Sequence, residues 1–270
     1  ITTADQLAEI RLRADAEAFQ ALRAACYADG FPLAPGETLQ SEHLVIAAGR
    51  EPLSLLENYT ARLGELMGAR LPAHIPTGWC TWYYFFGENT QQDVLDNLAE
   101  LTRESLPLDY VLIDDGYQRA IGDWLTPNHE RFGDMADLVR MIHAQGRRAS
   151  IWLAPFGLDP ESLSFQAHPD WVVRDDAGAP VVAWQHFGRD IYALDLSRPE
   201  VLEWLGTVFR TMRQDWGVDL FKVDFLFAGC APGRRRDSRF TRAQLLRRGR
   251  TALRQAIGDE AFLLACGAPL

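Results

Sequence analysis

The chain has 270 residues, of which 47% are hydrophobic and 24% are charged, so its composition is that of a globular protein and not of a disordered chain. Its formal net charge of −10 argues against nucleic acid and against an anionic membrane surface as partners. No apolar run is long enough to span a bilayer, and no signal-peptide pattern opens the chain, so we expect a cytoplasmic protein.

The histidines and cysteines give no sign of a metal centre. The six histidines show neither H-x-H nor H-E-x-x-H spacing, and the four cysteines form no C-x-x-C pair. No Gly-rich loop precedes a helix in the form that phosphate binding requires. We therefore expect neither a metal nor a cofactor.

Residues 1–50 carry two conflicting patterns. Ala, Leu, Arg and Glu dominate residues 4–25, which favours helix, whereas the alternation of residues 10–13 is typical of a half-buried strand. The run Leu-Val-Ile at 44–46 indicates another strand. We favour short strands, which would form the C-terminal part of a β-rich N-terminal domain.

Residues 51–74 are predicted to form a linker helix. Pro52 suits a first helical position, and the apolar residues that follow it recur at spacings of three and four. Gly68 and Pro72 are expected to end the helix.

From residue 75 to residue 270 the chain alternates strands with helices. The expected strands are 77–82, 110–113, 149–155, 219–226 and 261–266. The expected helices are 93–103, 135–144, one that starts with Ser197 as its N-cap and runs to about Trp216, and 241–257. Residues 157–197 form a long excursion with a hairpin-like turn at 175–178. This α/β alternation predicts a parallel sheet, and its spacing suits the first part of a (β/α)8 TIM barrel that is incomplete in this chain; an open sheet is the alternative.

The stretch 219–226 places two charges inside an apolar strand. Side chains alternate along a strand with period two, so Lys222 and Asp224 are expected to point the same way. Burying these charges is costly unless they pair or serve a site. Lys222 is also the only lysine of the chain, and the other side chains with a fixed positive charge are all arginines. A buried ion pair that only closes a layer of the barrel is the structural alternative to a functional site.

Other polar and aromatic residues follow the remaining strands. Active sites of parallel α/β folds lie at the carboxyl ends of the strands. Read in order, those ends carry Trp82, Asp114, Asp115, Trp152, Lys222, Asp224 and Cys266. This set suits a neutral ligand rich in hydroxyl groups, because carboxylates accept hydrogen bonds from hydroxyls and indole covers the apolar face of a sugar ring.

Sugar hydrolysis needs two carboxyl groups, and Asp224 is the strongest candidate for the nucleophile. An ammonium group on Lys222 beside it would keep it ionised. We interpret the arginine-rich segment from Arg234 to Arg250 as a solvated loop and the outer face of a helix.

Five motifs together resemble the melibiase-type α-galactosidases of glycoside hydrolase family 36. They are Gly-Trp-Cys-Thr-Trp at 78–82, Ile-Asp-Asp-Gly-Tyr at 113–117, Ile-Trp-Leu-Ala-Pro-Phe at 151–156, Phe-Lys-Val-Asp-Phe at 221–225 and Ala-Cys-Gly-Ala-Pro-Leu at 265–270. They occur in the order of that family. The weaker run from Leu33 to Glu42 resembles the end of the β-sandwich domain that precedes the barrel there.

The resemblance implies a retaining enzyme that releases terminal α-linked galactose through a covalent glycosyl-aspartate on Asp224. It implies that Lys222, Asp114 and Asp115 bind the galactose, the two aspartates through its 4- and 6-hydroxyls. It further implies that Trp82 stacks on the sugar and that Trp152 and Cys266 line the pocket.

The family's acid/base is an aspartate on the strand after the Cys-Gly motif, and this chain ends at Leu270, before that strand. We therefore expect a fragment that lacks its proton donor and is inactive alone; Asp237 and Glu260 do not lie at strand ends. Trp124 is expected at the rim of the pocket. The partner is an α-galactoside, and a homo-oligomer is left open. A raffinose-synthase-like transglycosidase and a non-catalytic, truncated sugar-binding barrel remain the alternatives.

Overall fold

The computed structural model of the chain describes residues 5–16 and 18–268. It divides into two compact units, one of residues 1–75 with 237–247 and the other of residues 76–236 with 248–270. The second unit contains the parallel sheet and every predicted site residue.

Among its described residues, the first unit contains an antiparallel hairpin, one complete helix and the start of a second one. Strand β1 (Ala8–Ala14) pairs with β2 (Phe19–Cys26), so the strand interpretation of residues 10–13 is confirmed over the helical one. Helix α1 (Pro52–Met67) begins with its proline in the first turn and ends at Gly68, which adopts the left-handed conformation with φ 59°. The predicted strand at 44–46 is wrong: these exposed residues pair with no strand, and β-propensity alone does not make one.

The second unit is built on a five-stranded parallel sheet. Its strands are β3 (Gly78–Cys80), β4 (Tyr110–Ile113), β5 (Arg148–Leu153), β9 (Leu220–Val223) and β10 (Phe262–Ala265). Their order in the sheet is β10-β9-β5-β4-β3, and all four pairings are parallel. The order therefore follows the chain without reversal, and right-handed connections then place the connecting helices on one face.

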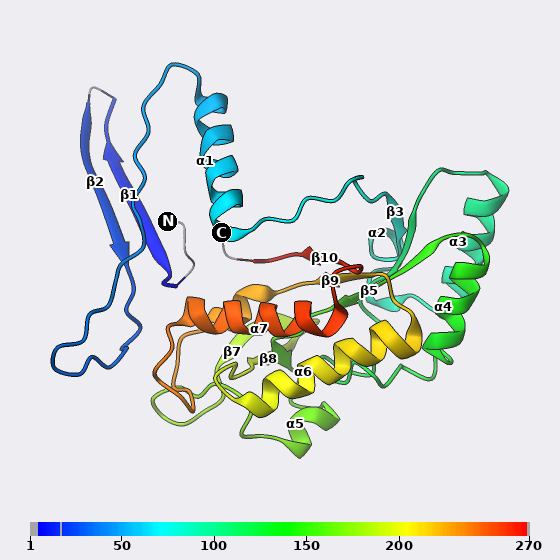
Figure 1. Cartoon of the computed structure of the whole chain (residues 1–270). Helices are drawn as coiled ribbons and strands as arrows, with labels where there is room; N and C mark the ends of the chain where they lie inside the picture. The colour runs from blue at the N-terminus through cyan, green and yellow to red at the C-terminus, as the bar shows by residue number, and fades with distance from the viewer. Residues whose placement is uncertain (1–4, 17, 269–270) are drawn as a thin grey trace. The chain divides into compact units, whose positions relative to one another are not determined.

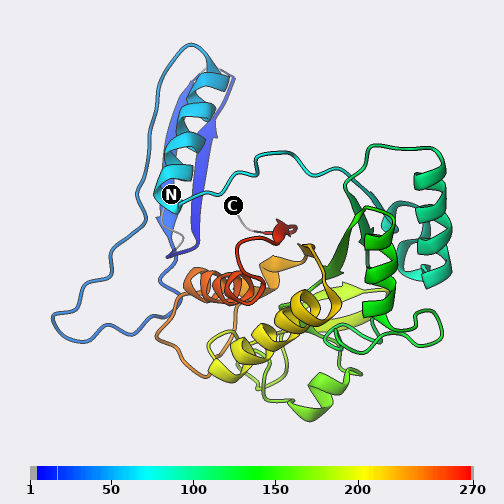
Figure 2. The same ribbon diagram turned by 45° about the vertical axis from the view of Figure 1, so that its right-hand side comes forward.

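Helices connect the successive strands of this sheet (Figure 1, Figure 2). They are α3 (Gln91–Arg103), α4 (Met135–Ala144), α6 (Pro199–Thr211) and α7 (Arg242–Ile257), and a π-helix, η2 (Met212–Trp216), continues α6. The start of α3 is fixed by a capping box between Thr90 and Asp93, and that of α4 by the Asp134 side chain. The predicted helices are thus confirmed to within a few residues, but the N-cap of α6 is Arg198 and not the predicted Ser197.

The sheet and its helices share an apolar core. The central strands contribute Val111, Ile151 and Phe221, each at most 1% exposed, because strands of a parallel sheet are covered on both faces. Phe209 of α6 stacks on Phe221 with ring centroids 5.3 Å apart. This packing fixes β9, the strand that carries Lys222, against α6.

Between β5 and α6 the chain forms a small antiparallel sheet. It consists of β6 (Gly157–Leu158), β8 (Arg189–Ala193) and β7 (Val182–His186), in that order. The predicted turn at 175–178 is present between the bridged residues Arg174 and Pro180. The β7–β8 hairpin itself was not predicted, because its Phe187-Gly188 turn lies outside the common two-residue signatures.

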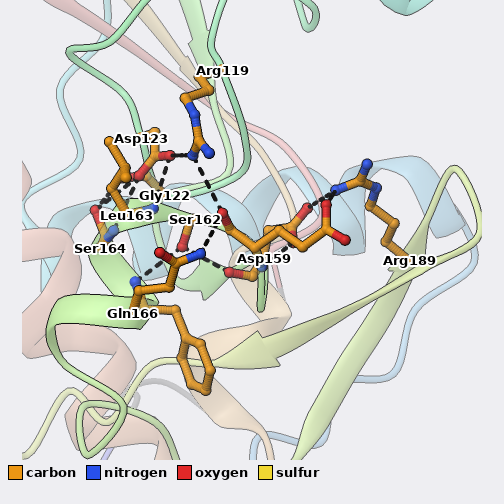
Figure 3. A network of polar contacts seen from close by, with 11 residues as sticks. Arg119, Gly122, Asp123, Asp159, Ser162, Leu163, Ser164, Gln166 and Arg189 are labelled. Atoms are coloured by element: carbon orange, nitrogen blue, oxygen red, sulfur yellow. Dashed lines mark hydrogen bonds and ion pairs between the residues drawn. The ribbon is translucent and has the colours of Figure 1, made fainter.

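A polar network fastens this excursion to the loop after β4 (Figure 3). The Asp123 carboxylate accepts hydrogen bonds from the backbone N–H groups of Leu163 and Ser164, at 3.0 and 3.2 Å, where helix α5 (Leu163–Ala167) begins. Arg119 donates to the same carboxylate at 2.6 Å. On the other side, Arg189 of β8 forms an ion pair with Glu161. The start of the excursion is therefore bound to the loop after β4 through Asp123, and the Arg189–Glu161 pair joins β8 to that start within the excursion itself.

Four predicted strands are shorter than expected. Those expected at 149–155 and 261–266 span Arg148–Leu153 and Phe262–Ala265. The strand expected at 77–82 ends at Cys80, and Trp82 instead opens the short helix α2 (Trp82–Phe85). The strand expected at 219–226 ends at Val223, because Phe225 takes a left-handed conformation with φ 51° that a strand cannot continue. A 3-10 helix, η3 (Leu226–Cys230), follows it.

Candidate active site

The predicted site residues gather at the carboxyl end of the parallel sheet. Asp114 and Asp115 directly follow β4, Asp224 directly follows β9, and Cys266 directly follows β10. Lys222 lies within β9 and pairs in register with Trp152 of β5. Because parallel strands end at one edge, the sequence places all of these groups on the same rim.

Asp114 and Lys222 form a buried ion pair. The Lys222 Nζ lies 2.8 Å from Asp114 Oδ2, and the two side chains are 14% and 2% exposed. The Cys80 thiol also donates to Asp114 Oδ2 at 3.4 Å, and the Asp115 backbone N–H donates to Oδ1 at 3.0 Å. The expectation that Lys222 pairs with Asp224 needs correction, since its ion pair is with Asp114, which follows β4.

This pairing shifts the pKa of both neighbours of Asp114. Burial lowers the pKa of the Lys222 ammonium, but the hydrogen bond and the charge of Asp114 outweigh it, so the net pKa is raised and Lys222 stays charged. Burial, followed by the charge of Asp114, raises the pKa of the Cys80 thiol to about 12. Cys80 is therefore a neutral donor at physiological pH and not a thiolate.

Asp224 is half-buried, and each of its carboxylate oxygens accepts a hydrogen bond. The Trp152 Nε1–H donates to Oδ2 at 3.3 Å, and the Phe225 backbone N–H donates to Oδ1 at 2.8 Å. Phe225 holds its left-handed backbone because its ring stacks on Trp184 of β7, with centroids 4.7 Å apart and planes 4° from parallel. A bulky residue in this conformation is strained, and the stacking supplies the contact that maintains it.

Asp115 accepts from two side chains, His186 and Gln118. Gln118 Nε2 donates to Oδ1 at 2.6 Å, and His186 Nε2 lies 2.8 Å from Oδ2. His186 comes from the end of β7 and stacks on Trp152, with centroids 6.2 Å apart and planes at 17°. Neither residue was predicted, and no pattern in the sequence marks His186, which lies in the unpredicted hairpin.

The remaining predicted residues differ in exposure. Trp82 is half-buried and packs edge-on against Phe86 at 5.5 Å. Burial, followed by the charge of Asp224, raises the pKa of the Cys266 thiol. The expectation that Trp124 lies at the rim is wrong: it is 1% exposed and packs edge-on against Trp152 at 6.0 Å, as part of the core beneath the site.

No three His, Cys, Asp or Glu side chains in residues 5–16 and 18–268 gather in a way that could hold a metal ion. In the same ranges no helix combines the length and apolar character that crossing a membrane requires.

Comparison with known proteins identifies the family. The profile of the melibiase family matches residues 67–238, which include most of the site. The chain belongs to the melibiase family. The predicted relationship to the α-galactosidases of glycoside hydrolase family 36 is confirmed.

Curated members of the family match along the same region. The bifunctional α-galactosidase/sucrose kinase AgaSK of Mediterraneibacter gnavus is 29% identical over 188 residues, which are 63% of this chain and 19% of that protein. An α-galactosidase of Escherichia coli is 27% identical over 160 residues, 57% of this chain and 21% of that protein. The chain thus spans about a fifth of the length of these relatives.

A solved structure supports the same relationship. The chain resembles the α-galactosidase TtGalA of Thermus thermophilus, in complex with p-nitrophenyl α-D-galactopyranoside, with a TM-score of 0.66 and 41% identity. The match covers 74% of this chain and 40% of that one. The α/β fold with its parallel sheet is therefore that of part of a family 36 enzyme.

Proposed function

We propose that this chain carries the galactose-binding and nucleophile half of a retaining α-galactosidase active site, with Asp224 as the nucleophile. The observation that carries the proposal is the pair of donors on Asp224. Trp152 and the Phe225 backbone hold the carboxylate at the carboxyl end of β9, beside the Lys222–Asp114 pair. A nucleophilic carboxylate has to be rigidly aimed, and a donor on each of its two oxygens fixes its orientation.

In this mechanism a carboxylate oxygen of Asp224 attacks the anomeric carbon of a terminal α-galactoside. The bond from that carbon to the leaving oxygen breaks, the leaving oxygen takes a proton, and a galactosyl ester of Asp224 remains. Water then attacks the same carbon, loses a proton, and releases galactose with its configuration retained. We assign the proton donor to no residue of this chain.

The other polar residues bind the sugar. Asp114 and Asp115 accept hydrogen bonds from the 4- and 6-hydroxyls, and Lys222 donates to a ring hydroxyl while neutralising Asp114. Trp82 covers the apolar face of the ring, and Trp152 and Cys266 complete the wall. α-Galactosides are the substrate class, in keeping with the p-nitrophenyl galactoside and stachyose bound in the Thermus thermophilus enzyme.

The proposal includes a closed (β/α)8 barrel, of which residues 75–270 form the first part. A strand order that follows the chain without reversal supports it, since doubly wound sheets reverse at a switch point and barrels do not. Within this proposal residues 1–50 end a β-rich domain and residues 51–74 link it to the barrel.

Covalent trapping tests the assignment of Asp224. Protein expressed from its complete gene is incubated with a slow fluorinated α-galactoside, digested, and analysed by mass spectrometry. We expect the label on the peptide that contains Asp224, and no label in Asp224→Asn, whose nearly isosteric side chain leaves the fold intact. Label on a different carboxylate would refute the assignment.

A further inference from the structure

A histidine from the β7–β8 hairpin lies against the candidate sugar site. His186 Nε2 is 2.8 Å from Asp115 Oδ2, and the two side chains are 15% and 3% exposed. We propose that His186 is a sugar-binding residue that takes one hydroxyl of the galactose ring through Nδ1. This inference rests on the proposed function and adds to it a recognition residue from outside the parallel sheet.

The hydrogen bond to Asp115 determines which nitrogen of the His186 ring faces a ligand. Asp115 is an acceptor, so the nitrogen that faces it, Nε2, carries a proton. In the neutral ring the other nitrogen, Nδ1, is then an acceptor. The hydrogen bond to Asp115 therefore leaves Nδ1 as the atom of His186 that is available to a ligand.

The other ring nitrogen of His186 is Nδ1. Within residues 5–16 and 18–268, Nε2 is the only nitrogen of His186 with a hydrogen-bond partner. Nδ1 is not one of the buried, unpartnered polar atoms of those residues, so solvent reaches it. A half-buried ring nitrogen that is accessible and unsatisfied, next to a sugar-binding carboxylate, suits a hydroxyl donor.

Three aromatic side chains surround the His186 ring and orient it. One face stacks on Trp152, while Phe187 packs edge-on at 4.6 Å and Phe225 at 6.1 Å. These rings leave the imidazole little rotational freedom, so its acceptor is pre-organised. Trp152 is itself only 2% exposed, and it contacts Asp224 through its Nε1–H.

Two substitutions separate the hydrogen bond from the stacking. His186→Phe keeps an aromatic ring against Trp152 but removes both ring nitrogens, whereas His186→Gln restores an amide that can donate and accept. With p-nitrophenyl α-galactoside and the protein expressed from its complete gene, we expect His186→Phe to raise KM about tenfold with little change in kcat. We expect His186→Gln to recover most of the loss, which a purely steric role of the ring does not predict.

Deoxygalactoses identify the hydroxyl that His186 takes. Galactose and its 2-, 3-, 4- and 6-deoxy derivatives are titrated as ligands of the wild-type protein and of His186→Phe. We expect one deoxy sugar to bind the wild type about tenfold more weakly than galactose does, and to lose that disadvantage in His186→Phe. Equal disadvantages in both proteins for all four sugars overturn the proposal.

The chain offers a matched control in His143. His143 Nε2 lies 2.8 Å from Asp219 Oδ2, the same geometry at the opposite end of β9. His143→Phe should leave KM and galactose affinity unchanged, and an equal rise of KM in both variants contradicts a role in binding.

The two proposals fail separately. If the wild-type protein is labelled on Asp224 and His186→Phe has the wild-type KM, the proposed galactosidase function is supported and the role of His186 is overturned. A wild-type protein that neither binds galactose nor takes the label overturns both.

Discussion

At the scale of single residues, the most informative group is the Asp114 carboxylate. It is 2% exposed and neutralised by Lys222, the only lysine of the chain. We expect Asp114→Ala to weaken galactose binding by about 10- to 100-fold, the cost of a hydrogen bond to a charged group, and to affect glucose less, because only galactose has an axial 4-hydroxyl. Calorimetric titration with both sugars checks this, and equal losses for the two sugars count against the assigned contact.

A second prediction at this scale concerns the Cys80 thiol. Its pKa of about 12 means that it stays protonated until the pH approaches that value, and only the thiolate reacts rapidly with alkylating agents. At about pH 8 we expect iodoacetamide to modify the exposed Cys26 and to spare Cys80 in the folded protein.

Peptide mass spectrometry before and after denaturation measures the two sites. Unfolding removes the burial and the neighbouring Asp114 charge, so Cys80 should react as readily as Cys26 in denaturant. Rapid alkylation of Cys80 in the native protein means that the thiol does not donate to Asp114.

The sequence reveals some residues of the site better than others. Asp114, Asp115, Lys222 and Asp224 stand out because charges that interrupt or end an apolar strand need a physical reason to be there. His186 gives no such signal: it lies in a hairpin with a mixed pattern, and only the folded chain brings it to Asp115. The partner of Lys222 is likewise a matter of tertiary structure, since 108 residues separate it from Asp114.

At the scale of elements, the hairpin contacts the residue next to Asp224, the proposed nucleophile, through stacked rings. Trp184 of β7 stacks on Phe225, the residue whose left-handed backbone directs its N–H to Asp224. Beneath Trp184 lies Gly157 of β6, where an added Cβ would lie 2.2 Å from the indole ring. Only glycine fits there.

We therefore expect Gly157→Ala to displace Trp184, to destabilise the protein by about 1–3 kcal/mol, and to slow the labelling of Asp224. Denaturant unfolding and the rate of covalent trapping measure the two effects. Gly206→Ala in α6 is the matched control, since its added Cβ meets only the flexible end of Arg210 and should leave the labelling rate unchanged. A normal labelling rate in folded Gly157→Ala would show that Trp184 does not position the nucleophile.

Elements with a strong period are predicted best. Strand 110–113 and helix 135–144 have their predicted bounds, because a short apolar run indicates a buried strand and an amphipathic repeat indicates a helix. The strand at 44–46 failed because strands depend on partners that a local pattern does not reveal. Residues 219–226 were predicted as one strand, but the Trp184–Phe225 contact ends it early.

At the scale of the whole molecule, the proposed mechanism allows either water or a second sugar to take the galactosyl group from Asp224. In the proposal both outcomes use Asp224, and the choice of acceptor depends on the rim of the site. For the hydrolase that we propose, we expect an α-galactoside incubated with excess sucrose to yield mainly free galactose. Chromatography of the products measures this, and a predominance of galactosyl-sucrose would make the protein a transglycosidase.

The central claim is that Asp114, Asp115, Lys222 and Asp224 converge on one galactose ring. A crystal structure of the Asp224→Asn protein, expressed from its complete gene and soaked with an α-galactoside, tests it most directly. We predict a galactose ring whose hydroxyls lie within hydrogen-bond distance of both aspartates and of Lys222, with its anomeric carbon facing residue 224. A galactoside bound elsewhere, or a ring turned with its anomeric carbon away from residue 224, would contradict the account.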